Sequence, residues 1–63
     1  MKKILLEVNC DTLEIYTMDG SKYKVMPDDI IICCTWTPTM ELEIDNKKKT
    51  CTATSIDATV RIK

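Results

Sequence analysis

The chain has 63 residues, of which 44% are hydrophobic, and its nine basic residues nearly balance ten acidic ones. The net charge of −1 provides no general attraction to nucleic acid or to an anionic membrane. A chain of this length is expected to form one small domain, residues 1–63, and such domains usually need a disulfide, a metal or a partner for stability. It contains no run of about 18 apolar residues, so we expect no membrane segment.

The four cysteines are expected to be reduced thiols of a cytoplasmic protein. The apolar stretch after Met1 is shorter than the roughly 7–15 residues of a secretory signal, which argues against an oxidising compartment. Cys33 and Cys34 would point to opposite faces of a strand, and Cys10 lies in a predicted turn. The chain has no histidine and no Cys-x-x-Cys pair, so we expect no metal and no cofactor.

The first strand is predicted at Lys3–Val8, where alternation places Ile4, Leu6 and Val8 on one face. The turn that follows it contains Asn9, Cys10 and Asp11, whose Asn and Asp side chains bond locally to the backbone.

Two further strands, Thr12–Thr17 and Ser21–Met26, are predicted to form a hairpin. A three-residue loop ending at Gly20, in the left-handed conformation that glycine adopts at low cost, places Ile15 opposite Tyr23. A two-residue loop would instead put lysines on the apolar face, so the hydrophobic pattern selects the register of the three-residue loop.

The segment Ile30–Thr37 is predicted to be a central strand covered on both faces, because it is apolar or β-branched at nearly every position. Pro27–Asp29, just before it, predicts a tight corner or a single turn of 3₁₀ helix. The strand should end at Pro38, which cannot donate to a β-ladder.

The second half of the chain is predicted to contribute three more strands. Met40–Asp45 alternates with its apolar residues inward, and Thr50–Thr54 returns beside it with Cys51 opposite Leu42. A short strand, Thr59–Ile62, completes the chain. About six or seven short strands without substantial helix predict an all-β fold, either a small, strongly bent antiparallel barrel (SH3-like or OB-like) or a compact two-sheet sandwich.

Catalysis is not indicated. Nucleophilic catalysis normally couples a hydroxyl or thiol to a base, most often His, which this chain lacks. Glu41, Glu43 and Asp45 alternate along one strand face, which is the pattern of any solvated strand. We therefore expect a protein that is not an enzyme.

The hypothesis favoured by the sequence is a protein–protein interaction module that acts as a subunit, adaptor or inhibitor and associates with itself. Its apolar residues exceed what one face of each strand can bury, and aromatic residues and Met are common at interface cores. The predicted partner is another protein, a second copy, or both. The predicted contact residues are Trp36, Met18, Tyr16 and Ile31.

The alternative hypothesis is a small barrel that binds nucleic acid, by stacking of bases on an aromatic residue next to lysines that contact phosphates. Its predicted contact residues lie on the outer face of the hairpin and in a basic turn: Tyr16, Lys22, Lys24, Lys47, Lys48 and Lys49.

Overall fold

The computed structural model describes residues 1–63 and contains one antiparallel sheet of six strands in the order β3-β2-β1-β4-β5-β6. The expected all-β fold is confirmed, since only the short segments η1 and α1 are helical. The elements are β1 (Lys2–Asn9), β2 (Glu14–Thr17), β3 (Lys22–Lys24), the 3₁₀ turn η1 (Pro27–Asp29), α1 (Ile30–Cys33), β4 (Glu41–Asp45), β5 (Thr50–Ala53) and β6 (Ala58–Arg61).

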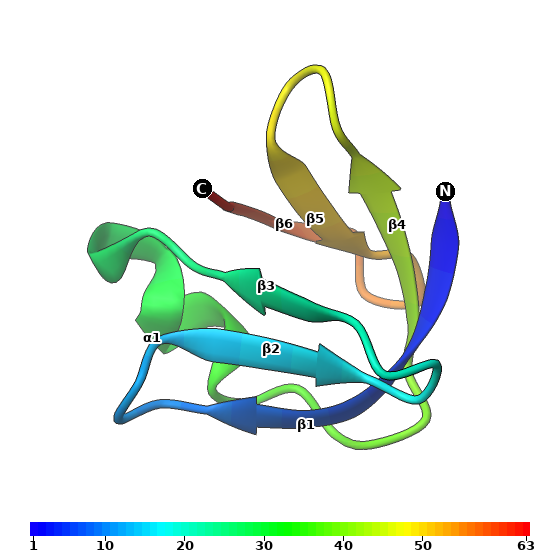
Figure 1. Cartoon of the computed structure of the whole chain (residues 1–63), viewed down its shortest axis with the longest axis horizontal. Helices are drawn as coiled ribbons and strands as arrows, with labels where there is room; N and C mark the ends of the chain where they lie inside the picture. The colour runs from blue at the N-terminus through cyan, green and yellow to red at the C-terminus, as the bar shows by residue number, and fades with distance from the viewer.

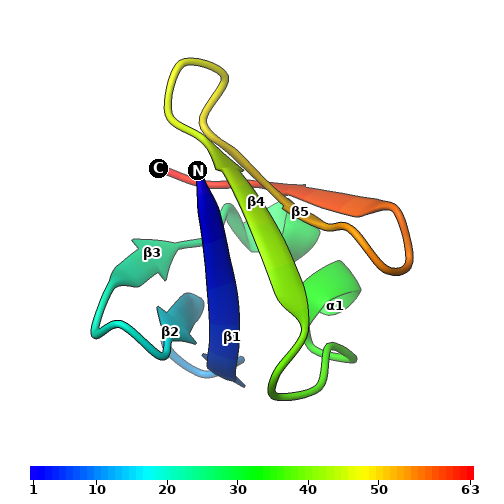
Figure 2. The same cartoon turned by 90° about the vertical axis from the view of Figure 1, so that its right-hand side faces the viewer.

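Strand β1 joins the two halves of this bent sheet. Its first residues, Lys2–Ile4, pair with β4, whereas its later residues, from Leu5 to Asn9, pair with β2 (Figures 1 and 2). The sheet is not closed, because its edge strands meet only at the bridge between Val25 and Ile62. Helix α1 packs against β6.

The edge of β6 is covered by the turn η1. The Asp29 carboxylate accepts hydrogen bonds from the Arg61 backbone N–H at 2.8 Å and from its Nε at 3.0 Å. These bonds hold the pKa of Asp29 below its usual value, and the bond from the Arg61 guanidinium has the larger effect. An edge N–H that would otherwise invite another strand is thereby occupied.

A β-bulge in β1 changes which side chains face the core. The register shifts between Leu5, which pairs with Thr17, and Glu7, which pairs with Tyr16. The prediction that Leu6 and Val8 share a face was therefore wrong, because the extra residue of a bulge breaks the alternation. Leu5 is fully buried and Val8 packs against the core, while Leu6 is 48% exposed.

The β2–β3 hairpin has the predicted register. Glu14 pairs with Lys24, Ile15 with Tyr23 and Tyr16 with Lys22. Gly20 has a φ of 91°, as the three-residue loop requires.

The β4–β5 hairpin differs from the prediction by two residues. Ala53, not Cys51, lies opposite Leu42, and Cys51 pairs with Ile44. The turn is longer than predicted because the Asp45 carboxylate accepts hydrogen bonds from the N–H groups of Lys47 and Lys48, both at 3.0 Å. A shift of two residues keeps each side chain on its predicted face.

The predicted central strand Ile30–Thr37 was wrong. Its first four residues form α1, which continues directly from η1. Pro27 at the start of η1 has its φ fixed near the helical value and favours a helical start, and a short apolar run fits a helix as well as a strand. Only one face of α1 is covered: Cys33 is buried, whereas Ile31 is 79% exposed.

The prediction of four reduced cysteines was also wrong. Cys10, in the turn after β1, forms a disulfide with Cys34 at the end of α1. Cys33 and Cys34 do not lie on opposite faces of a strand, because this segment is helical. A link over 24 residues stabilises a fold by about 3 kcal/mol in the chain-entropy treatment. Cys33 and Cys51 remain free and buried, and burial raises the pKa of the Cys51 thiol to about 12.

The core lies inside the bend of the sheet. It is built from the inward side chains of β1, β2, β4, β5 and β6, the bridge pair Val25 and Ile62, and residues of the helical segment and the loop after it. Its buried members are Leu5, Ile15, Val25, Cys33, Trp36, Leu42, Ile44, Cys51, Ala53, Val60 and Ile62.

The bulge can be tested with two neighbouring leucines. Leu5→Ala should lower the free energy of unfolding by about 2–5 kcal/mol, because it removes a fully buried side chain. Leu6→Ala should change it by no more than about 0.5 kcal/mol. Urea denaturation followed by Trp36 fluorescence measures both, and equal losses would contradict the bulge.

Candidate functional site

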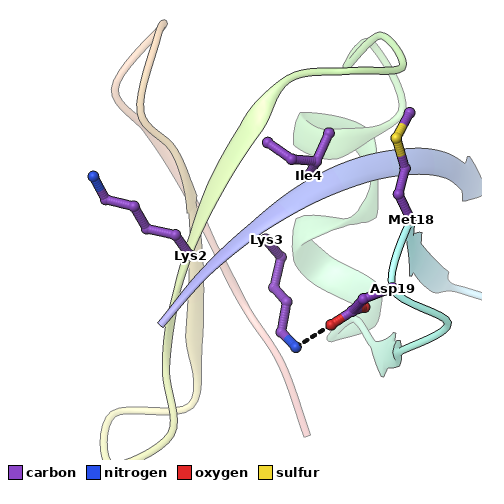
Figure 3. A pocket seen from close by; sticks show the side chains of 5 residues that line it. All are labelled: Lys2, Lys3, Ile4, Met18 and Asp19. Atoms are coloured by element: carbon purple, nitrogen blue, oxygen red, sulfur yellow. Dashed lines mark hydrogen bonds and ion pairs between the residues drawn. The ribbon is translucent and has the colours of Figure 1, made fainter.

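A cavity of about 430 Å³ lies where β1 continues past the end of β2. We call it the notch. Five residues from the first half of β1 and from the tip of the β2–β3 hairpin line it: Lys2, Lys3, Ile4, Met18 and Asp19 (Figure 3). It arises because the hairpin turns away at Gly20 while β1 continues towards its N-terminal end along β4.

The apolar wall of the notch is formed by Ile4 and Met18. Their side chains point to the same side of β1, with 39% of Ile4 and 51% of Met18 exposed (Figure 3). The two residues are joined through the backbone, since the Met18 N–H donates to the Ile4 carbonyl at 2.9 Å. Met18 was identified from the sequence as an interface residue, but Ile4 was missed. Apolar residues on both faces of β1 were the sequence feature that could have indicated an exposed apolar side chain there.

The polar wall is organised by the Asp19 carboxylate. It accepts hydrogen bonds from the Lys3 ammonium, the Thr17 hydroxyl and the Ser21 backbone N–H. The hydrogen bond from Lys3 is the main reason that the pKa of Asp19 lies well below its usual value, and the bond from Thr17 adds to it. Thr17 is buried, so this cluster fixes the hairpin tip beside β1.

The backbone of β1 is open on the side of the notch. Leu5 directs its N–H and C=O towards the chain before β4, where they bond to Met40 and Thr39. In an antiparallel ladder neighbouring residues point to opposite sides, so Lys2 and Ile4 direct their backbone groups towards the notch. The ladder with β2 begins only at Leu5. The Ile4 N–H and both backbone groups of Lys2 are therefore left without a strand partner.

The other predicted interface residues lie elsewhere. Trp36 is a core residue with 6% of its surface exposed, and its indole N–H has no hydrogen-bond partner. Ile31 projects from α1. Tyr16 is half-buried on β2, where its hydroxyl donates to Glu14 at 2.9 Å. The structure thus brings Met18 together with Ile4, and not with Trp36 or Ile31.

The lysines of the alternative hypothesis do not form one surface. Lys22 and Lys24 flank Tyr16 on the β2–β3 hairpin, but Glu14 lies among them, with its carboxylate 3.6 Å from the Lys22 ammonium. The Lys24 ammonium donates to the Thr12 carbonyl at 2.7 Å. The basic turn at residues 47–49 belongs to the separate β4–β5 hairpin (Figure 1).

The acidic row on β4 is divided among different partners. Glu41 lies 3.9 Å from the Lys2 ammonium, and Glu43 lies 3.1 Å from the terminal ammonium. Asp45 caps its turn, and the hydrogen bond from the Lys48 N–H is the main reason that its pKa is lowered. No group of three or more acidic or Cys side chains is arranged to hold a metal ion. Neither helical segment has the length and apolar character to cross a membrane.

Comparison with protein families, with curated proteins and with solved structures gives no match. The notch is therefore the feature of the molecule that indicates a function. Its features are an apolar wall, an ion pair and an unpaired stretch of strand.

The Asp19 cluster predicts how stability depends on pH. A carboxyl group whose pKa is lowered by folding stabilises the protein above its unfolded pKa, 3.8, and this contribution is lost as the pH falls below about 4. Asp19→Asn should therefore lower the melting temperature at pH 7 and flatten its decline between pH 5 and pH 2. Thermal unfolding by circular dichroism measures this.

A matched control is Asp11→Asn, at an exposed turn position whose side chain forms no ion pair. It should retain the wild-type slope. If Asp19→Asn also kept the wild-type slope, the ion pair would not contribute to stability.

Proposed function

We propose that this protein is a non-enzymatic protein-interaction module that docks on a partner through the notch. The observation that carries the proposal is the pairing of exposed Ile4 and Met18 beside an unpaired stretch of β1. Apolar side chains that are exposed together near polar groups are typical of an interface. As a subunit, adaptor or inhibitor, the module would act by occupying a surface of its partner.

Self-association is part of this proposal. Ile31, 79% exposed on α1, is the predicted contact that lies farthest out of the core, and it leaves the notch free for another protein. Trp36 would take part only indirectly, by supporting the loop that follows α1, because it is buried in the single chain.

Nucleic-acid binding receives less support. The hairpin lysines are each engaged by an acceptor, and the remaining three lie on another hairpin. A site for a charged backbone needs several basic groups along one path.

The proposal predicts that partner capture depends on Met18. In a pull-down with nuclease-treated lysate of the native source, Met18→Ser should reduce recovery of a stoichiometric protein by about tenfold or more, which corresponds to the loss of about 1.4 kcal/mol. Ile56→Ser is the matched control, because Ile56 is 55% exposed in the turn between β5 and β6. It should leave recovery unchanged.

Three results would count against the proposed function in different ways. Equal recovery with Met18→Ser would exclude the notch. Recovery that is lost with nuclease would favour nucleic acid. A strictly monomeric mass by light scattering at tens of micromolar would remove self-association.

The cytoplasmic location expected from the sequence is a proposal that the disulfide tests. Structural disulfides are rare in the cytosol and common in oxidising compartments. A cytoplasmic location therefore requires that cellular reductants open the Cys10–Cys34 bond of the structure, and both thiols should then react when intact cells are treated with an alkylating agent before lysis. Recovery of the Cys10–Cys34 bond by mass spectrometry would contradict this location.

A further inference from the structure

We propose that the notch binds an extended acidic segment of the partner as an added β-strand along Lys2–Ile4. An apolar side chain of that segment would pack against Ile4 and Met18, and a carboxylate two residues away would meet Lys2. This inference rests on the proposed function and adds the chemical class of the partner and its mode of binding.

The first support is the unpaired backbone edge. The Ile4 N–H and the N–H and C=O of Lys2 face the notch, beyond the first β1–β2 pair at Leu5. Two donors and one acceptor at strand spacing match an extended peptide, which presents its own backbone groups with the same repeat. A compact ligand without such a repeat would leave some of these groups unpaired.

The second support is the spacing of the side chains. Lys2 and Ile4 are two residues apart on β1 and therefore lie on one face, about 6.5–7 Å apart. A strand added alongside presents its own outward side chains at the same interval. When an apolar residue of the added strand lies opposite Ile4, the residue two positions away on that strand lies opposite Lys2.

The third support is charge. Asp19 is already paired with Lys3, so Lys2, whose ammonium contacts only Glu41, is the more accessible cation of the two that line the notch. Its side chain is 72% exposed, and its nearest carboxylate, that of Glu41, lies 3.9 Å away. An incoming carboxylate would find an exposed cation without having to displace a close ion pair.

The charge also decides between two possible occupants. A second copy that paired its own Lys2–Ile4 edge in the notch would bring Lys2 and Lys3 of both chains together. Like charges on adjacent strands are destabilising, and lysines at an edge are a common protection against self-pairing. The occupant is therefore a different, acidic protein segment.

The notch is preorganised for binding an extended segment. Lys2–Ile4 is held extended by pairing with β4 on its other side, and the Asp19 cluster fixes the position of the hairpin tip. Little conformational freedom of the module would be lost on binding.

The test is selection of binders from a phage-displayed library of random peptides against the immobilised full chain. Enriched peptides should share an apolar and an acidic residue two positions apart. Met18→Ser and Lys2→Gln should each weaken binding of the synthetic peptide by about fivefold or more, whereas Ile56→Ser should not. Hydrogen exchange measured by NMR should show protection of the Lys2 and Ile4 amides when the peptide is bound.

The failures of the two proposals are distinguishable. Peptides that need Met18 but leave both amides unprotected would overturn strand addition and leave the interaction surface standing. Peptides that bind independently of Met18 would overturn the notch as the binding surface. Enrichment without acidic residues, or no enrichment, would overturn an acidic peptide as the partner.

Discussion

The double pairing of β1 is the constraint on which the rest of the structure depends. One strand contributes to both halves of the sheet, with its first residues beside β4 and its later residues beside β2. The bulge at the crossover increases the bend and turns both Leu5 and Val8 towards the core, although they are three positions apart and strict alternation would place them on opposite faces. Around this strand a chain too short for two stacked layers encloses its apolar residues by bending a single sheet. The remaining gap between the edge strands is spanned by the Val25–Ile62 bridge and by the bonds from Asp29 to Arg61.

The hairpins were predictable because their registers depend on local chemistry. At Gly20 two readings of the loop differed by one residue, and the lysines on β3 allowed only one of them. The β4–β5 register differed by two residues, which hydrophobic alternation cannot detect, since both alternatives bury the same set of side chains. What decided it was the Asp45 side chain capping the turn, a hydrogen-bonding preference and not a hydrophobic one.

The helical segment was missed for the same reason that one of the two grounds for reduced thiols failed. An apolar run such as Ile30–Cys33 has no period of its own, and the β-branched residues favoured a strand. In a strand, Cys33 and Cys34 would point to opposite faces, and Trp36 would lie just before the break at Pro38. The helical turn that begins at Pro27 shortens the chain, places Cys34 beside Cys10 and carries Trp36 into the core. One error in secondary structure therefore changed the thiol prediction and the position of the expected interface residue.

The candidate site follows from a difference in strand length, which no single residue reveals. Strand β1 has eight residues and β2 only four, so part of β1 extends past the point where the hairpin turns away. Met18 was identifiable as an apolar residue in a loop tip, but its partner Ile4 became visible only when the bulge placed Leu5 inward and left Ile4 outside. A sheet whose strands were matched in length would bury these groups within its own ladder. Here β1 is paired with β4 along its first residues and with β2 along its last, and the unpaired side of Lys2–Ile4 is the place where the sheet can accept one more strand.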